Sequence, residues 1–68
     1  MYRRLQRLRK ENGFTCSDMA TLLGLKTKAG YSKKERGRTK FSLDDAKKIS
    51  RFFGEPIDAI FFENKVSY

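Results

Sequence analysis

The sequence predicts an all-α protein made of five short helices in one small domain. Apolar residues recur at helical spacing in five segments, glycines separate most of these segments, and no stretch alternates apolar and polar residues as a strand would. The chain has 68 residues, and 38% of them are hydrophobic. A chain this short buries only about 60% of the surface that its unfolded form exposes, so it has room for a single core.

The first predicted helix covers residues 2–11. Leu5 and Leu8 fall on one face of this segment and basic residues occupy most of the remainder, which is the pattern of an amphipathic helix. Asn12 and Gly13 end it, because glycine readily adopts the left-handed conformation that closes many helices.

The second predicted helix is shorter and runs from Cys16 to Leu23. Thr15 is a suitable N-cap, and Asp18 stands three positions later, which is a weak form of the capping box. Gly24 then breaks the helix. The apolar residues at helical spacing in this segment are Met19, Ala20, Leu22 and Leu23.

The third predicted helix lies between Thr27 and Arg36. Thr27 suits the N-cap position, and Gly37 provides a C-terminal stop. Gly30 costs about 1 kcal/mol relative to alanine in a helix interior. The helix therefore begins either directly after Thr27 or closer to Gly30.

Two further helices complete the predicted domain. Ser42 repeats the N-cap signal with two aspartates in the following turn, and Gly54 ends this fourth helix. Pro56 suits the first turn of a fifth helix. The predicted buried faces are Leu43, Ala46, Ile49 and Phe53 in the fourth helix, and Ile57, Ile60 and Phe61 in the fifth. We expect residues 1–62 to form the domain and residues 63–68 a C-terminal tail.

The charge of the chain indicates a polyanionic partner. Sixteen Lys and Arg residues stand against eight Asp and Glu residues, which gives a net charge of +8. A nucleic acid or an anionic membrane surface would suit this charge. Seven cations and one acid, Glu35, lie between Lys26 and Lys40, a net charge of +6. The first helix has a second basic face, for which a solvated surface is expected and a phosphate contact is the alternative: Arg3, Arg7 and Lys10.

Several classes of protein and site are not expected from this composition. One Cys and no His form neither an internal disulfide nor a zinc site, and they fit a reducing, cytoplasmic setting. No apolar run resembles a signal peptide or approaches the length of a membrane span, about 18 residues. Without His, a Gly-rich phosphate loop or a paired-carboxylate signature, we expect no enzyme activity, no cofactor, no metal and no small-molecule substrate.

One ordered set of residues extends over most of the chain. Its members are Thr15, Met19, Ala20, Leu22, Leu23, Gly24 and Leu25, then Tyr31, Ser32, Glu35 and Gly37, and finally Ser42, Leu43, Pro56, Ile57, Asp58, Ile60 and Phe61. With this set, positions 3–62 resemble the phage repressor and Cro-like family of helix-turn-helix domains. The resemblance implies a compact five-helix fold, similar to the DNA-binding domain of lambda repressor, that binds double-stranded DNA.

Some positions depart from the pattern of that family. Cys16 stands where the family often has Gln, Lys34 where it has an apolar residue, and Phe41 where it commonly has Pro. One additional residue lies between Gly24 and Tyr31, which shifts the register of the base contacts by about one position.

The resemblance assigns the third helix to the major groove, where base pairs present distinct edges. The residues expected at base edges are Thr27, Lys28, Ala29 and Ser32, with Lys26 and Lys33 on either bases or phosphates. The residues expected at phosphates are Cys16, Ser17, Arg36, Arg38 and Lys40. Tyr31 matches a position that is mostly buried in the family, so we expect its ring in the core. Arg9 and Glu35 match a pair that the family often joins as a salt bridge, which is either buried or exposed here.

The resulting hypothesis is a sequence-specific transcriptional regulator, a phage- or mobile-element-type repressor that binds a near-palindromic operator as a homodimer. The fifth helix and the pair Phe61-Phe62 are the candidates for the dimer contact. One alternative is an antitoxin-like DNA-binding protein whose C-terminus binds a partner protein. A basic RNA-binding module is a weaker alternative, because the aromatic residues fall mainly at core spacing.

Overall fold

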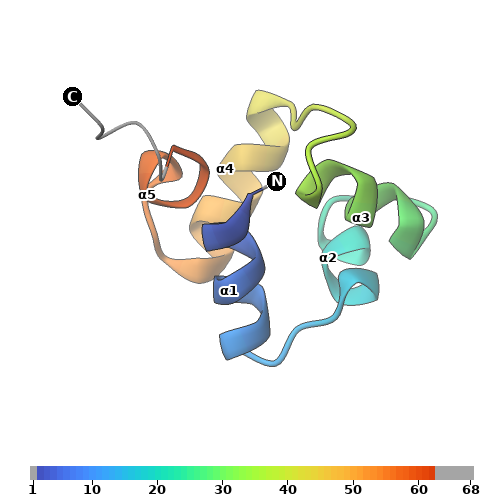
Figure 1. Cartoon of the computed structure of the whole chain (residues 1–68), viewed down its shortest axis with the longest axis horizontal. Helices are drawn as coiled ribbons and strands as arrows, with labels where there is room; N and C mark the ends of the chain where they lie inside the picture. Colours follow the sequence, from blue (N-terminus) through green and yellow to red (C-terminus); the bar gives the residue numbers. More distant parts are fainter. Residues whose placement is uncertain (1, 63–68) are drawn as a thin grey trace.

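The computed structural model describes residues 2–62, and the regular structure in this range is entirely helical. The helices are α1 (Arg3–Glu11), α2 (Cys16–Leu22), α3 (Lys28–Glu35), α4 (Leu43–Phe53) and α5 (Ile57–Phe61) (Figure 1). The all-α, five-helix class predicted from the sequence is confirmed. The predicted tail, residues 63–68, lies outside the described residues.

The helices are arranged along the longest axis of the molecule. Figure 1 shows α2 and α3 together at one end, α5 at the other, and α1 and α4 between them. The packing agrees with this view, since α2 contacts α3, and α5 contacts both α1 and α4. The α2–α3 pair thus packs at one end of the group that the other three helices form.

Two capping boxes begin α2 and α4. In α2 the hydroxyl of Thr15 accepts a hydrogen bond from the backbone N–H of Asp18 at 3.1 Å, and the Asp18 carboxylate accepts one from the N–H of Thr15 at 2.9 Å. Ser42 and Asp45 make the same reciprocal pair, at 3.0 and 3.1 Å. Both start signals predicted from the sequence are confirmed, because each side chain satisfies a backbone donor that the helix leaves free.

The observed first residues of α3 and α5 differ from two starts considered in the sequence analysis. The side-chain oxygen of Thr27 accepts a hydrogen bond from the N–H of Gly30 at 3.1 Å, and the helix begins at Lys28. The alternative start near Gly30 is therefore wrong, since this glycine lies in a capped first turn. Pro56 occupies the N-cap position with ψ of 152°, so it precedes α5. The prediction that Pro56 lies in the first turn of this helix is therefore wrong.

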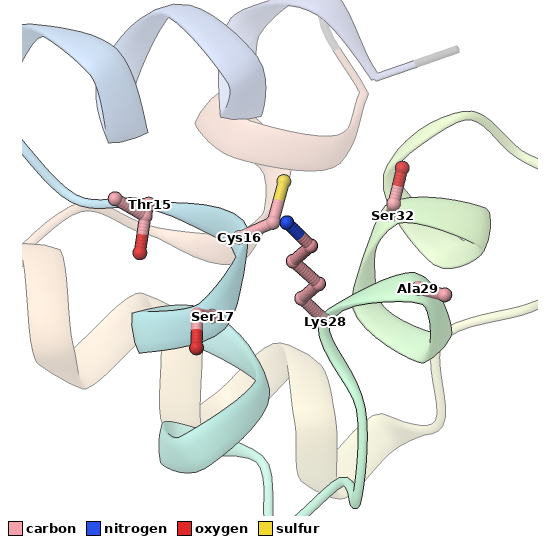
Figure 2. Close-up of a pocket in the computed structure, with 6 residues that line it drawn as sticks. All are labelled: Thr15, Cys16, Ser17, Lys28, Ala29 and Ser32. Carbon is pink, nitrogen blue, oxygen red and sulfur yellow. The ribbon is translucent and has the colours of Figure 1, made fainter.

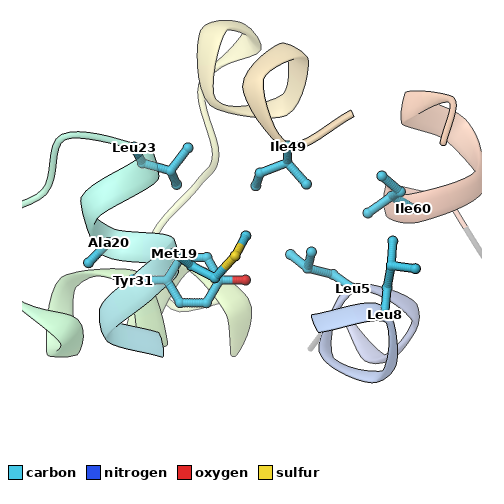
Figure 3. Close-up of a cluster of buried hydrophobic side chains, with 8 residues drawn as sticks. All are labelled: Leu5, Leu8, Met19, Ala20, Leu23, Tyr31, Ile49 and Ile60. Atoms are coloured by element: carbon cyan, nitrogen blue, oxygen red, sulfur yellow. The ribbon is translucent and has the colours of Figure 1, made fainter. Parts of the chain in front are cut away.

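The core draws one fully buried side chain from each helix. Leu5, Met19, Tyr31, Ile49 and Ile60 come from α1 to α5 in that order, and each is 0% exposed (Figure 3). Leu8, Ala20 and Leu23 complete the buried cluster. Tyr31 lies in the core, as expected. Because every helix contributes to the same cluster, the position of α3 depends on all of them.

Leu43 contradicts the predicted buried face of α4, since it is 66% exposed. It is the first residue of the helix, and long side chains in helices lean back toward the N-terminus. Leu43 therefore extends past the end of the core, whereas Ala46 and Ile49 are buried one and two turns later.

The two unusual residues Lys34 and Phe41 compensate each other. The ring of Phe41 packs against Tyr2 and Phe61, with centroids 5.3 and 5.1 Å away. The Lys34 amine lies 5.8 Å from the centre of that ring and forms an ion pair with Asp45 at 3.2 Å. Long basic side chains commonly cover apolar surface with their stem in this way. The amine also donates to the carbonyl of residue 40 at 2.9 Å.

Alanine substitutions at Gly24 and Gly30 are expected to change the stability of the protein in opposite directions. Gly24 has φ of +72°, a conformation in which a side chain is strained, so Gly24→Ala is expected to lower the free energy of unfolding by about 1–2 kcal/mol. In Gly30→Ala the added methyl would meet no atom closer than 3.5 Å, so that variant is expected to gain up to about 1 kcal/mol. Urea unfolding measures both changes. A Gly24→Ala protein as stable as the parent would contradict this account of the turn.

Candidate nucleic-acid interface

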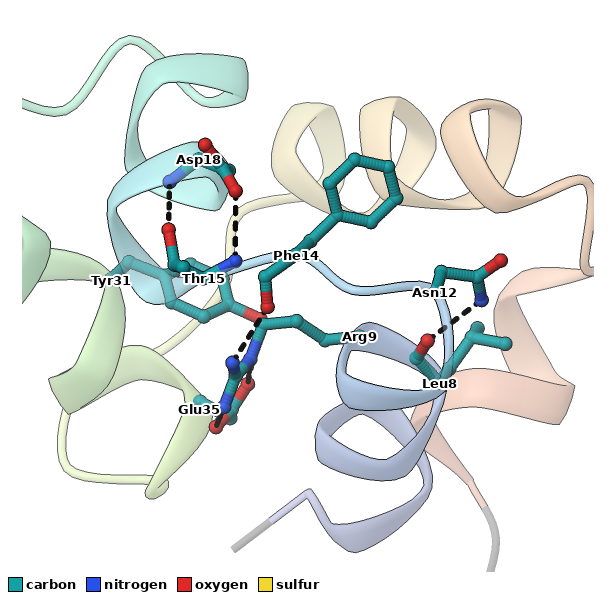
Figure 4. A network of polar contacts seen from close by, with 8 residues as sticks. All are labelled: Leu8, Arg9, Asn12, Phe14, Thr15, Asp18, Tyr31 and Glu35. Carbon is teal, nitrogen blue, oxygen red and sulfur yellow. Dashed lines mark hydrogen bonds and ion pairs between the residues drawn. The ribbon is translucent and has the colours of Figure 1, made fainter.

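A buried polar network fixes the C-terminal end of α3 to α1. Arg9 donates from Nε and Nη2 to the two carboxylate oxygens of Glu35, at 2.9 and 3.1 Å (Figure 4). The hydroxyl of Tyr31 donates to the same carboxylate at 2.9 Å, and Nη1 of Arg9 donates to the carbonyl of Phe14 at 3.0 Å. The two charged side chains are only 9% and 4% exposed, so the expected salt bridge is present in its buried form.

The electrostatics of this network favour the protonated forms of Arg9 and Tyr31. The hydrogen bond to Glu35 and the negative charge of that residue raise the pKa of Arg9, although burial opposes them. Burial, reinforced by the charge of Glu35, raises the pKa of Tyr31. Arg9 thus remains charged and Tyr31 remains a donor at neutral pH. Because the pKa of Tyr31 is raised on folding, its contribution to stability is complete below the unfolded pKa of about 10 and falls as the pH rises above it.

The N-terminal segment also holds the end of α3. The backbone N–H of Tyr2 donates to the carbonyl of Glu35 at 2.9 Å, and the N–H of Arg38 donates to the carbonyl of Lys33 at 2.9 Å. These bonds satisfy carbonyls that the end of a helix leaves without partners. One end of α3 is therefore pinned inside the protein, and the other end is left at the surface.

The exposed end of α3 faces α2 across a groove, which Figure 2 shows with its lining side chains. Thr15, Cys16 and Ser17 form the α2 wall, and Lys28, Ala29 and Ser32 form the α3 wall. Cys16 and Ser32 are half-buried, and the other four are exposed. The groove brings together five residues that the sequence analysis assigned to bases or phosphates.

The remaining predicted residues do not line this groove. Lys26 and Thr27 precede α3, and Lys33 is on it. Arg36, Arg38 and Lys40 are exposed in the connection from α3 to α4. Thr27 has a structural task as well, because its oxygen caps α3.

Two features of this region were not predicted from the sequence. Thr15 was considered only as a helix cap, but it also lines the groove; its place directly before Cys16 was the available signal. Lys34 was counted in the charge of the basic stretch, and its ion pair with Asp45 was not predicted. Burial raises the pKa of Asp45, but hydrogen bonds from the N–H of Ser42 and from Lys34 outweigh this effect, so the pKa is lowered.

Six of the seven cations between positions 26 and 40 thus remain available to a ligand. Within residues 2–62 the ion pairs involve only two members of this stretch, Lys34 and Glu35. The cations without such a partner are Lys26, Lys28, Lys33, Arg36, Arg38 and Lys40, and all of them are exposed. Amines, hydroxyls and a methyl group on one surface are the groups that contact the edges and phosphates of a duplex.

Comparison with known proteins gives one finding that agrees with this geometry. A family model described as "Helix-turn-helix" matches residues 5–60. This range includes α2, α3 and α4 completely, α1 without its first two residues and α5 without its last residue. No curated protein and no solved structure matches the chain. In the part of the chain that the structure describes, no helix has the length and apolar character of a membrane span.

Proposed function

Because the chain belongs to the helix-turn-helix family of phage repressor and Cro-like DNA-binding domains, we propose that it is a sequence-specific transcriptional repressor whose α3 enters the major groove. The observation that supports this most strongly is the groove between α2 and α3. Side chains able to contact bases lie there at the exposed end of a helix whose other end is anchored by a buried salt bridge.

In this proposal the N-terminal half of α3 contacts base edges. Lys28 donates to guanine, Ser32 donates or accepts, and the methyl group of Ala29 contacts thymine. Thr27 keeps its hydroxyl hydrogen for a base while its oxygen caps the helix. Lys26, which precedes α3, and Lys33, which lies on it, contact either a base or a phosphate.

Phosphate contacts set the position of the protein along the duplex. Cys16 and Ser17 provide them from the first turn of α2, and Arg36, Arg38 and Lys40 provide them from the connection to α4. Such contacts fix the register without reading sequence. Cys16 and Ser17 precede α3 in the chain and the three cations follow it, so we expect the phosphates they bind to lie on either side of the bases that α3 reads.

We propose further that residues 1–62 are the DNA-binding domain and that two copies form a dimer through the surface around α5. An apolar groove there is lined by Tyr2, Phe41, Ser42, Leu43, Ala46, Ile57, Phe61 and Phe62. Leu43 is 66% exposed and Phe62 is 54% exposed, which is unfavourable in water unless another surface covers them. A dimer would place two copies of α3 in successive major grooves, about 34 Å apart.

Selection of bound duplexes from a random pool, with the mass of the protein in solution measured alongside, tests this function. We expect enrichment of a near-palindrome whose half-sites are about 10 base pairs apart. We also expect a mass near twice the 8.0 kDa of one chain. A pool without an enriched sequence would refute sequence-specific binding. An enriched single half-site with an 8.0 kDa species would refute the dimer alone.

The same apolar groove supports a second candidate, an antitoxin-like protein that binds DNA through α3 and a partner protein through its C-terminal side. The measured mass separates the two functions. A stable 8.0 kDa monomer that forms a complex with the product of a neighbouring gene favours the antitoxin, whereas self-association without that product favours the repressor.

A further inference from the structure

The outer surface of α1 carries cations that the α2–α3 groove does not include. Arg3, Arg7 and Lys10 are exposed and line one shallow groove together with Gln6 and Glu11. Spacings of four and three residues place the three cations on one face of the helix. None of them takes part in an ion pair within residues 2–62. We call Arg3, Arg7 and Lys10 the α1 row.

The electrostatics of the helix disfavour most of the α1 row, although Lys10 lies in the last turn, where the helix dipole favours a cation. The N-terminal end of a helix carries a partial positive charge, yet the first turn of α1 contains Arg3 and no acidic residue. Arg3 and Arg7, and likewise Arg7 and Lys10, are neighbouring like charges, which destabilise a helix. Glu11 follows Arg7 by four residues, which is the weaker orientation for an opposite-charge pair, so it offsets only part of this repulsion.

The outer face of α4 exposes the same number of cations in a more favourable arrangement, although Arg51 follows Lys47 and Lys48 by four and three residues and repels both. Asp44 lies in the first turn and precedes Lys47 and Lys48 by three and four residues, the stronger orientation for such pairs. Arg51 lies in the last turn, where the helix dipole favours a cation. In α4 the pairs with Asp44 thus offset the repulsion between neighbouring cations, whereas Glu11 offsets only part of the repulsion within the α1 row, which an external anion would relieve.

We propose that the α1 row binds the phosphate backbone of the duplex that α3 enters, at the flank of the major-groove contact. This inference rests on the proposed DNA-binding function. The connection from Glu11 to Cys16 is short enough to keep the end of α1 within about 18 Å of the α2 wall of the groove. From Arg3 to Lys10 the helix rises about 10 Å. A helix lying along the duplex axis would pass about three phosphates of one strand over that rise.

Two matched triple variants test the proposal. Arg3→Gln, Arg7→Gln and Lys10→Gln together remove the α1 row, and Lys47→Gln, Lys48→Gln and Arg51→Gln together remove the same charge from α4. Each protein is titrated with a selected duplex and with an unrelated duplex, both extending well beyond the operator, at several salt concentrations. The α1 variant is expected to lose at least tenfold in affinity for both duplexes at about 0.1 M salt, with a salt slope smaller by nearly three. The α4 variant is expected to lose less than about threefold, because its cations lie outside the contact.

Equal losses in the two variants would show an effect of net charge alone and would overturn the proposal. On a duplex trimmed to the operator edge the two variants are expected to bind with equal affinity, because the flanking phosphates are absent. A difference in affinity that persists on this duplex also overturns the proposal. Vesicles containing phosphatidylserine provide the last comparison. If the α1 row is needed for binding to them and not for binding to DNA, the row is a membrane contact. A parent protein that distinguishes no duplex would instead refute the proposed function.

Thermal unfolding checks the electrostatic premise without DNA. The α1 variant is expected to melt at or above the temperature of the parent protein, since repulsion between like charges is removed. The α4 variant is expected to melt below it, because favourable pairs with Asp44 are lost. The reverse order would overturn the inference.

Discussion

Replacing Glu35 with Gln is expected to lower the free energy of unfolding by about 3–5 kcal/mol. The variant leaves the guanidinium of Arg9 buried without a counter-charge, since the side chains of this pair are only 9% and 4% exposed. For a domain of this size the melting temperature should fall by more than about 12 °C. Calorimetry or circular dichroism measures the shift. Because small domains have only about 5–15 kcal/mol of stability, the variant is expected to be partly unfolded near 37 °C.

Glu55→Gln is the matched control for this experiment. Glu55 pairs with Arg4 at 3.7 Å, and the two side chains are 36% and 35% exposed. The same chemical change there is expected to cost less than about 1 kcal/mol, because water screens the pair. A triple variant with Arg9→Met, Tyr31→Phe and Glu35→Leu should recover most of the loss, since it removes the buried charges together. If Glu35→Gln melts like Glu55→Gln, the network does not anchor α3.

Replacing Lys28 and Ser32 with Ala is expected to remove most of the preference for the selected operator. A base contact is worth about 1–3 kcal/mol of discrimination, so the ratio of affinities for the operator and for an unrelated duplex should fall at least about tenfold. Affinity for the unrelated duplex should change little, because only one cation is lost. Lys28 is exposed and Ser32 half-buried, so the fold is expected to be retained. Fluorescence anisotropy with the two duplexes gives the ratio.

Replacing Arg38 and Lys40 with Ala gives the opposite pattern. Both duplexes should bind more weakly by the same factor, and the salt slope should fall by about two, because phosphate contacts do not depend on sequence. Intact discrimination in the Lys28 and Ser32 variant, or lost discrimination in the Arg38 and Lys40 variant, would assign base reading to the wrong residues.

The sequence was sufficient to predict the helices because local signals agree with the final packing. Thr15 and Ser42 are capping residues, and each is followed three positions later by an aspartate. The reciprocal hydrogen bonds of both capping boxes form as expected. Gly24 has the positive φ that its place between α2 and α3 requires. The pairing of Arg9 with Glu35 followed from the family resemblance, since the two residues are 26 positions apart and no local pattern joins them.

Other features depend on tertiary contacts that a sequence pattern does not contain. Leu43 fits the helical periodicity of a buried face, but its place at the start of α4 takes it beyond the core. Lys34 adds to the local charge, yet Asp45 comes from a different helix and pairs with it. The groove between α2 and α3 depends on how two short helices cross, which explains why Thr15 was recognised only as a cap.

The most direct test of the account follows the backbone amide resonances of labelled protein by NMR during titration with the selected duplex. If the buried scaffold presents the N-terminal half of α3 to base edges, the largest shifts will occur at residues 26–32 and at Thr15, Cys16 and Ser17. The interior residues Met19 and Ile49 should change little. Largest shifts on α5 or on the outer face of α4, with residues 26–32 unchanged, would contradict the account.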